Sequence, residues 1–299
     1  MAEHSSLRAA ARQLHVTQPA VTRAVRELES SLGVALVHRG TRGVELTEYG
    51  RTLLQRAQVI FEEARRAEEE LVRMRDGEGG SVTAAISAVA GLTILPRALT
   101  AFRARMPRAA LSFSEASLPI SKDELALGRL DFVVLHECAN EGDDGFAREL
   151  LFESPLVVVA RNAHPLRRVG SLAALRDQTW LFPGSARSGD LPLLQAFRSL
   201  RLAPPGDVIL CASLTAALRI IQQSDALAFV SRYMFSGHPF AGRIGPLALK
   251  ENLPVAKVVV LTRRGSPLTH PARQFVDCLR DAARHMVPTA PGVDVKGSR

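Results

Sequence analysis

The sequence predicts three consecutive parts: a small helical domain with a β-hairpin, one long helix, and a larger α/β domain. Three observations predict this order. Apolar residues recur at spacings of three and four from residue 7 to residue 32, and a similar spacing returns from residue 53 to residue 74. After the glycine-rich residues 77–80, short apolar strands alternate with amphipathic helices. At 299 residues the chain exceeds the size at which one core keeps growing, so several domains are expected.

Residues 6–14 and 17–28 are predicted to form two short helices joined by a tight turn. Ser6 and Thr17 are placed to cap these helices, and Pro19 is tolerated in a first turn, where its missing N–H has no partner. One face of the second helix is apolar, and another carries short polar side chains and arginines. Such side chains at a helix N-terminus can bond to base edges and phosphates in a major groove. The residues predicted to do so are Ser6, Thr17, Gln18, Pro19, Thr22, Arg23 and Arg26.

Residues 33–46 predict two short strands around a basic, glycine-hinged tip. Arg42 at this tip can reach phosphate or the minor groove, and Arg39 lies beside it. Taken alone, the helix pair fits a polar helical hairpin inside a larger fold equally well. The basic hairpin directly after it favours a winged helix that binds DNA.

Five motifs follow one another in this region: Leu7-Arg-Ala-Ala-Ala11, Thr17-Gln-Pro-Ala-Val-Thr-Arg23, Glu27-Leu-Glu29, Leu32-Gly-Val34 and Arg39-Gly-Thr-Arg-Gly-Val-Glu-Leu-Thr-Glu-Tyr-Gly50. In this order they resemble the LysR-type transcriptional regulators. The resemblance implies a winged helix–turn–helix that binds double-stranded promoter or operator DNA, a long linker helix, and a two-lobed α/β effector domain like the periplasmic binding proteins. It also implies contact with RNA polymerase and a homotetramer built from dimers.

The N-terminus departs from the family pattern. Family members usually begin with a further amphipathic helix before the position of Ser6, and only residues 1–5 precede it here. Without that helix, Leu7, Ala11 and Val25 are expected to be partly bare.

The longest predicted helix begins after the cap Thr47 and runs to about Asp76. Its apolar residues keep a heptad spacing, with charged residues on the other faces. A helix lying on its own domain is the alternative, but so narrow a seam favours pairing with the same helix of a second copy. The seam consists of Leu53, Ala57, Ile60, Ala64, Ala67, Leu71 and Met74.

The remaining chain predicts parallel sheets covered on both faces. The expected strands are 82–87, 110–115, 130–135, 180–182, 208–211, 226–230 and 255–261, and residues 150–160 form an apolar run. The expected helices are 91–105, 121–127, 171–175, 191–200, 214–223 and 271–285. We therefore divide the chain into a DNA-binding domain (1–46), a dimerisation helix (47–76), a hinge (77–80), effector lobe I (81–155 with 256–286), effector lobe II (156–255) and a disordered tail (287–299).

Ligands of such sheets bind at the carboxyl ends of strands. Ser87, Ser121, Ser185 and Ser231 stand at or near strand ends, although a helix cap is the simpler role for each serine taken singly. The resemblance places the effector cleft at Ser87, Ala88, Val89, Ile120, Ser121, Phe182, Pro183 and Ser185, with Val230 and Ser231 close by. The hydroxyls suit an anionic group, and the apolar neighbours suit a hydrocarbon or aromatic part.

Patterns typical of an enzyme are weak or missing in the sequence. Neither serine of residues 184–189 fits a nucleophile elbow, no dinucleotide glycine fingerprint follows a strand, and His136-Glu-Cys138 is a poor ligand set because neighbouring strand residues point to opposite faces. We therefore expect no catalytic residues, no metal and no cofactor. A two-lobed solute-binding protein or enzyme without a DNA-binding role is the alternative.

Charge and cysteine usage add smaller constraints. Residues 1–80 hold twelve arginines, no lysine and twelve acidic residues, so the net charge of +8 lies entirely in the rest of the chain. That charge favours an anionic effector or simply solubility, and cannot serve as evidence for DNA binding. Apolar runs are too short for a membrane span, and no leader is seen. With Cys138, Cys211 and Cys278 far apart, we expect reduced thiols in a cytoplasmic protein.

Overall fold

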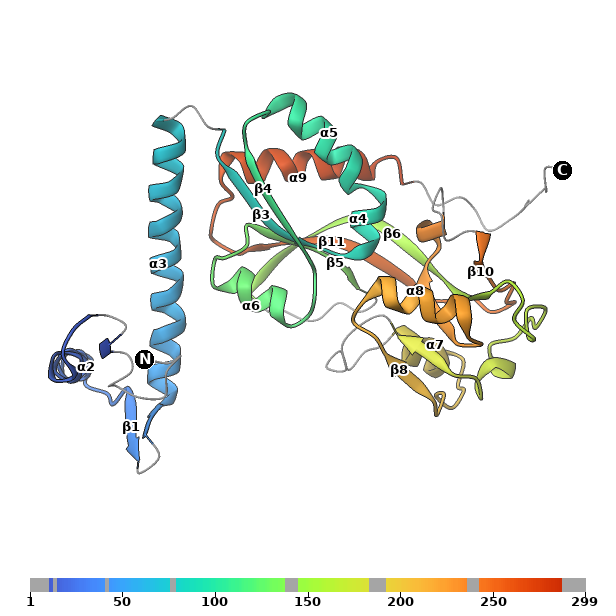
Figure 1. The fold of residues 1–299 in the computed structure, drawn as a ribbon, viewed down its shortest axis with the longest axis horizontal. Coiled ribbons are helices and arrows are strands. Elements are labelled where there is room, and N and C mark those ends of the chain that lie inside the picture. Colours follow the sequence, from blue (N-terminus) through green and yellow to red (C-terminus); the bar gives the residue numbers. More distant parts are fainter. Residues whose placement is uncertain are drawn as a thin grey trace. The chain divides into compact units, whose positions relative to one another are not determined.

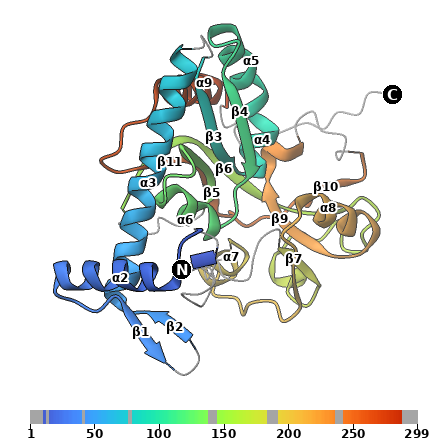
Figure 2. The same cartoon turned by 60° about the vertical axis from the view of Figure 1, so that its left-hand side comes forward.

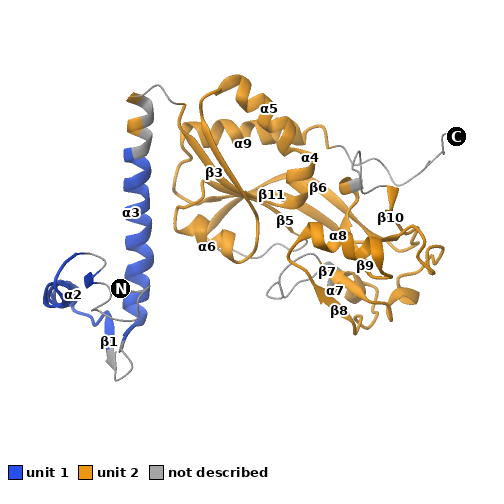
Figure 3. Ribbon diagram, viewed as in Figure 1, with its two compact units in different colours: residues 1–68 blue, residues 69–299 orange. Residues whose placement is uncertain are grey.

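The computed structural model describes residues 11–12, 15–40, 43–75, 79–137, 145–182, 192–235 and 242–286. The chain divides into two compact units, Met1–Glu68 and Glu69–Arg299, which Figure 3 colours separately. Predictions for the first helix with Ser6, for Arg42, for Pro183 and Ser185, for Cys138 and for the tail fall outside the described residues.

In unit 1 the predicted second helix is α2 (Gln18–Leu32), which ends four residues beyond the predicted end at residue 28. Its cap is the expected one, because Thr17 Oγ1 accepts a hydrogen bond from Ala20 N at 3.4 Å. At its end Gly33 adopts a left-handed conformation (φ 71°) and its N–H donates to the Glu29 carbonyl, which ends the helix in the usual way. The antiparallel hairpin β1 (Val37–Gly40) and β2 (Gly43–Leu46) follows, and then α3 (Glu48–Arg75), as Figure 2 shows.

Side-chain bonds tie the hairpin to both helices. The Glu29 carboxylate accepts the N–H groups of Leu36 (2.8 Å) and Val37 (3.2 Å). Thr47 donates its hydroxyl to the Ala35 carbonyl at 2.7 Å and caps α3 by accepting from Gly50 N at 3.0 Å. A Cβ at position 50 would overlap the Leu36 carbonyl oxygen, so only glycine fits there. The motif from Thr47 to Gly50 is therefore a packing requirement of the winged helix.

The apolar stripe of α2 is more exposed than a core face. Leu28 and Leu32 are 43% and 46% exposed, and Val25 is half-buried, as expected for that residue. Ala11 differs from the expectation, because it is buried.

Unit 2 is an α/β domain whose sheet is mixed rather than parallel. Among the described residues, the strands form a nine-stranded sheet in the order β4-β3-β5-β11-β6-β9-β7-β8, with β10 paired to β6. The strands are β3 (Ser81–Ile86), β4 (Ala110–Glu115), β5 (Phe132–Glu137), β6 (Phe146–Arg161), β7 (Trp180–Phe182), β8 (Val208–Leu210), β9 (Leu227–Ser231), β10 (Ile244–Pro246) and β11 (Val255–Arg263).

The prediction of purely parallel sheets is wrong at the centre. Strands β4, β3 and β5 are parallel at one end of the order, and β9, β7 and β8 at the other. The long strands β6 and β11 between them are antiparallel to each other, and also to β9 and β5 respectively. Two groups of parallel strands are thus joined through one antiparallel pair, which the alternation of strands and helices could not reveal.

Helices cover both faces of the sheet (Figure 1). They are α4 (Ala88–Thr93), α5 (Leu95–Arg105), α6 (Ile120–Ala126), α7 (Pro192–Ser199), α8 (Leu214–Gln223) and α9 (His270–Ala283), with short 3-10 turns η1 (Ala173–Leu175) and η2 (Arg232–Phe235). One core packs α4, α5 and α9 on Val134, Val258 and Val260. Another packs Leu125 of α6 on the alternate residues of the same strands. A third surrounds Trp180, which stacks on Phe229 and meets Phe197 edge-on.

The predicted helix 91–105 is wrong at its start and in its continuity. Helix α4 already begins at Ala88, and the chain breaks at Ile94 before α5 begins. Pro96 explains the break, because in a continuous helix its ring would clash with the carbonyl four residues earlier. The earlier start places Ser87 directly between β3 and a helix.

Candidate DNA-binding surface and effector site

Helix α2 presents the predicted polar side chains to solvent. Gln18, Pro19, Arg23 and Arg26 are exposed and Thr22 is half-buried, and α2 itself contains no buried residue. These side chains come from the first three turns, so the helix N-terminus and its free N–H groups lie beside them. Such a surface can bond to phosphates and base edges.

Arg23 forms a weak, exposed ion pair with Glu27. Its Nε lies 3.0 Å from Glu27 Oε1, one helical turn on, and the two side chains are 83% and 68% exposed. An exposed pair at this spacing contributes only about 0.3–0.5 kcal/mol, so a phosphate or a guanine edge can displace the carboxylate.

The hairpin that follows has the expected form. Its register pairs Val37 with Leu46 and Gly40 with Gly43. Arg39 lies on β1 opposite Val44, and Arg42 falls outside the described residues. The position of Arg39 at the end of the hairpin agrees with a wing, while contact of either arginine with DNA stays a prediction.

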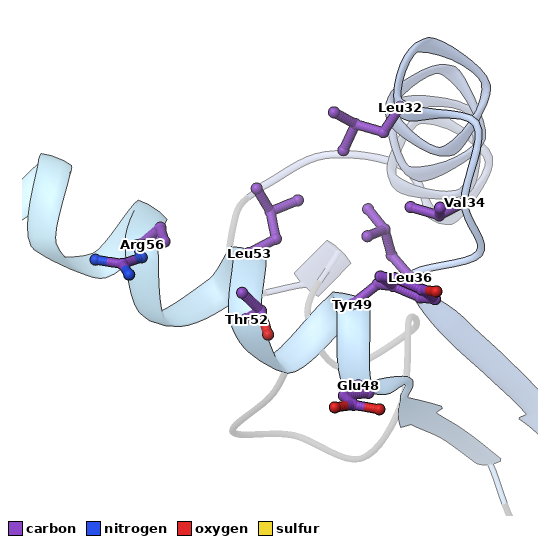
Figure 4. Close-up of a pocket in the computed structure, with 8 residues that line it drawn as sticks. All are labelled: Leu32, Val34, Leu36, Glu48, Tyr49, Thr52, Leu53 and Arg56. Atoms are coloured by element: carbon purple, nitrogen blue, oxygen red, sulfur yellow. The ribbon is translucent and has the colours of Figure 1, made fainter.

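Where α2 ends and α3 begins, unit 1 has an open pocket of about 480 Å³ (Figure 4). Its walls are apolar, with Glu48 and Arg56 adding charge. Farther along α3 the predicted seam is exposed: Ile60 and Leu71 are each 67% exposed, and Phe61 beside them is 75% exposed. The pocket is lined by Leu32, Val34, Leu36, Glu48, Tyr49, Thr52, Leu53 and Arg56.

In unit 2, predicted effector residues follow the carboxyl ends of the neighbouring strands β3 and β4. Ser87 follows β3, and its N–H donates to the Val134 carbonyl of β5 at 2.8 Å. Ala116 follows β4 and donates its N–H to the Ile86 carbonyl at 3.0 Å. Ser121 lies in the first turn of α6, a few residues beyond this strand end.

The serines differ in whether their hydroxyls cap a helix. Ser87 occupies the N-cap position of α4 but makes no side-chain cap bond. Its hydroxyl is buried and has no hydrogen-bond partner among the described residues. Ser121 accepts from Ser117 N at 3.0 Å within its own turn. Ser231 is fully buried at the end of β9, directly before η2, and its hydroxyl caps that turn by accepting from Tyr233 N at 3.2 Å. The cap interpretation is therefore wrong for the Ser87 hydroxyl and correct for Ser231.

A chain of hydrogen bonds links the two groups of parallel strands. His136 Nε2 of β5 lies 3.1 Å from Ser154 Oγ of β6, and Ser154 donates to Ser231 Oγ of β9 at 2.7 Å. Tyr233 N in η2 also donates to Ser231 Oγ, at 3.2 Å. We call His136, Ser154 and Ser231 the polar relay.

The relay contains a neutral imidazole. Burial lowers the pKa of His136 to about 4, because the charged form would lose its hydration. With Ser154 donating its hydrogen to Ser231, the neutral imidazole can donate to Ser154 from Nε2. The relay thus joins β5 to β9 without any charge.

The other predicted effector residues lie in different environments. Val89 and Val230 are buried and Ala88 is half-buried. Ile120 is 61% exposed and follows the cis Leu118–Pro119 peptide bond. Phe182 ends β7, next to β9 in the sheet, and is half-buried.

Sequence reasoning missed His136 as a structural group, and it missed Ser154 and Tyr233 altogether. Ser154 lies within an apolar run, and a buried hydroxyl there needs a hydrogen-bond partner. The sequence could therefore have indicated a polar contact at Ser154, but not the residue that makes it. Tyr233 packs edge-on against Phe152, with ring centroids 5.9 Å apart. Its hydroxyl is buried without a partner in the described part of the chain, and burial raises the pKa of this phenol.

Two further properties of the described residues bear on other functions. They hold no group of three or more His, Cys, Asp or Glu residues arranged to bind a metal ion. No helix among them is both long and apolar enough to span a bilayer.

Both units match proteins of one known family. Residues 75–284 match the profile of the LysR substrate binding domain, and residues 1–51 match the bacterial regulatory helix-turn-helix proteins of the lysR family. The regulator GbpR of Azospirillum brasilense is 26% identical over 94% of this chain and 83% of its own length. TdcA of Escherichia coli K12 is also 26% identical, over 92% of this chain and 88% of its own length.

Solved structures of LysR-family regulators share the fold. Full-length CbnR in complex with its target DNA superposes with a TM-score of 0.63 at 23% identity, covering 94% of this chain and 96% of CbnR. LysG of Corynebacterium glutamicum with bound effector Arg gives a TM-score of 0.62 at 18% identity, covering 95% of this chain and 94% of LysG.

Proposed function

Because this chain belongs to the LysR-type transcriptional regulators, we propose that a small molecule bound at the carboxyl edge of the unit 2 sheet controls its binding to promoter DNA. The chain is a DNA-binding regulator with a helix-turn-helix domain and an effector-binding domain. The two functions are assigned to separate sets of residues, one in unit 1 and one in unit 2.

DNA recognition is assigned to the exposed face of α2 and to the wing. The major groove is contacted by Gln18, Thr22, Arg23 and Arg26. The phosphates or the minor groove are contacted by Arg39 and Arg42 of the wing. Ser6, Thr17 and Pro19 support the helix termini and the backbone contacts. The observation that carries this assignment is the solvent exposure of the polar side chains of α2.

The regulator is proposed to act as a dimer through α3, assembling further into a homotetramer that also contacts RNA polymerase in the cytoplasm. Support for the dimer comes from the exposed apolar seam: Ile60, Phe61 and Leu71 are each at least two-thirds exposed on a helix otherwise covered with charge. A two-fold dimer places two recognition helices on one two-fold DNA site.

The dimer is tested by sedimentation velocity of the full chain. Ile60→Lys places a charge in the seam and is expected to shift the protein towards monomer, whereas Gln55→Lys on another face of α3 is the matched control. Equal assembly of both variants would contradict pairing through this seam.

Effector binding is assigned to Ser87, Ala88, Val89, Ile120, Ser121, Phe182, Pro183 and Ser185, with Val230 and Ser231 at its margin. The unpartnered, buried Ser87 hydroxyl carries this assignment, since native structures rarely leave such a group unbonded. A ligand that brings the two groups of parallel strands closer together changes the spacing of the two DNA-binding helices of a dimer.

The effector assignment is tested with a reporter gene placed behind the DNA upstream of this chain's coding region. Ser87→Ala is expected to blunt the response to the inducing compound, and an unchanged dose–response would remove Ser87 from the site.

A two-lobed solute-binding protein or an enzyme is the other function weighed for this fold. The matching relatives are transcriptional regulators. Helix α2 and the exposed seam of α3 would also have no use in either alternative. Failure of the full chain to retard any fragment of its own upstream DNA in a gel shift would favour that alternative.

A further inference from the structure

We infer that Tyr233 is an effector-contact residue, and that its hydroxyl and the Ser87 hydroxyl together hold the polar end of a small organic carboxylate. This inference rests on the proposed control by an effector. It adds to that proposal one residue from η2 and a chemical class for the ligand.

A closed circuit of contacts runs between these two residues. Ser87 donates its N–H to a main-chain carbonyl of β5 two residues before His136. From His136 the relay passes through Ser154 to Ser231, which accepts the N–H of Tyr233. The turn η2, which contains Tyr233, packs against α4, and α4 begins directly after Ser87. The contacts therefore return to their starting point, so Ser87 and the main chain of Tyr233 lie in one region of unit 2.

Two hydroxyls on this circuit have no partner. Ser154 and Ser231 use theirs in the relay, and both residues are fully buried. The Ser87 and Tyr233 hydroxyls are also shielded from solvent, yet neither has a hydrogen-bond partner among the described residues. Ser87 is only 7% exposed as a whole. One unbonded buried hydroxyl is uncommon, and two in one region of the domain point to a group that both can bond.

The chemistry of the circuit favours a carboxylate as that group. Both hydroxyls can donate, and a carboxylate accepts several hydrogen bonds at once, more strongly than a neutral carbonyl. The charged residues that act on the phenol are Arg232, which lowers its pKa, and Glu153, which raises it. Arg232 has the sign that attracts an anion, and the imidazole of the relay is neutral.

Apolar side chains beside the circuit suit the rest of the ligand. Val89, Phe152 and Val230 belong to the core against which Tyr233 packs, and Phe152 meets the tyrosine ring edge-on at 73°. Hydrocarbon or aromatic parts lie well against such groups. The ligand class is therefore a small carboxylate with an apolar body.

The test uses the full chain and isothermal titration with a series of aliphatic and aromatic monocarboxylates, each compared with its primary amide. At least one carboxylate is expected to bind, and its amide to bind about tenfold less tightly, since a hydrogen bond to a charged group is the stronger. Tyr233→Phe and Ser87→Ala are each expected to weaken that carboxylate by about tenfold or more.

Two readouts separate ligand contact from a structural role. Both variants remove an unbonded buried hydroxyl, so their thermal midpoints are expected to equal or exceed that of the unchanged chain. Matched controls are Tyr49→Phe, which changes the only other tyrosine of the chain, and Ser112→Ala on exposed β4. Neither control is expected to alter carboxylate affinity.

Three results would overturn the inference: no carboxylate binds, the amide binds as tightly, or Tyr233→Phe binds like the unchanged chain. A gel shift on the upstream DNA of the same samples separates this failure from failure of the proposed function. If a compound alters DNA binding equally in the unchanged chain and in Tyr233→Phe, effector control stands and only the role of Tyr233 is lost. If no compound of any class alters DNA binding, effector control itself fails.

Discussion

Helix α2 and the carboxyl edge of the unit 2 sheet both carry polar side chains, but α2 presents them to solvent and the sheet edge buries them. On α2 the strongest described polar contact of Arg23 is an exposed ion pair with Glu27. At the sheet edge the hydroxyls of Ser154 and Ser231 are bonded in the relay, and those of Ser87 and Tyr233 are left unbonded in the interior.

This difference follows from what each region binds. DNA has a dense negative charge and a large contact surface. Exposed arginines in weak ion pairs are therefore sufficient to bind it, and they cost the protein little folding stability. A small ligand offers few contacts, and each must be made where water does not compete. Changes at the sheet edge should therefore alter folding stability, while changes on α2 should alter DNA affinity and leave folding nearly unchanged.

The largest expected effect on stability comes from breaking the relay. Ser154→Ala removes the described side-chain partner of His136 and leaves the buried Ser231 hydroxyl with only the N–H of Tyr233. We expect a loss of about 3 kcal/mol in the free energy of unfolding, measured by urea titration. Ser112→Ala, on exposed β4, is the control and should stay within about 0.5 kcal/mol. If Ser154→Ala loses as little as this control, the relay hydrogen bonds contribute little to the free energy of unfolding.

Next in size is the pH dependence caused by His136. Its pKa falls from the ordinary histidine value of 6.5 to about 4 in the native state, so below pH 6.5 the unfolded chain binds a proton that the native state does not. Stability is therefore lost as pH falls, by about 2 kcal/mol between roughly pH 7.5 and pH 5. Urea titrations at several pH values measure this loss.

His136→Gln is the matched variant for this experiment, because its amide can still donate to Ser154 but does not titrate. Its stability is expected to vary less over the same pH range. If the two proteins show parallel pH profiles, another group causes the loss.

A smaller effect is expected on α2, and it concerns DNA rather than folding. Arg23→Ala should weaken binding to the specific site by about tenfold while leaving non-specific binding nearly unchanged. Arg42→Ala should instead lower affinity for all sequences and reduce the slope of log affinity against log salt by about one. Salt-titrated gel shifts distinguish the two. Unchanged operator binding by both variants would refute the assigned surface.

The smallest effect is expected for the partner of Arg23. Glu27→Gln removes the exposed ion pair and should change the free energy of unfolding by only about 0.3–0.5 kcal/mol. DNA affinity should rise, because the guanidinium no longer has to leave a carboxylate and a negative charge near the phosphates is removed. A fall in affinity would mean that Glu27 orients Arg23 for DNA.

Features set by neighbouring residues were predictable from the sequence. Thr17 caps α2 and Thr47 caps α3 as expected, and Gly33 ends α2. The hairpin and the long helix lie where the spacing of apolar and glycine residues placed them. Caps, turns and helix faces depend on residues a few positions apart, so a single chain displays them directly.

Only the tertiary structure could decide how distant strands pair. Alternating strands and helices predicted parallel sheets, but β11 returns antiparallel between β5 and β6 after a long stretch of chain. The same pairing brings His136, Ser154 and Ser231 together, although they lie far apart in the sequence. It also leaves the hydroxyls of Ser87 and Tyr233 buried and unbonded among the described residues. Burial and the identity of a hydrogen-bond partner are properties of the assembled core, and no local pattern of residues encodes them.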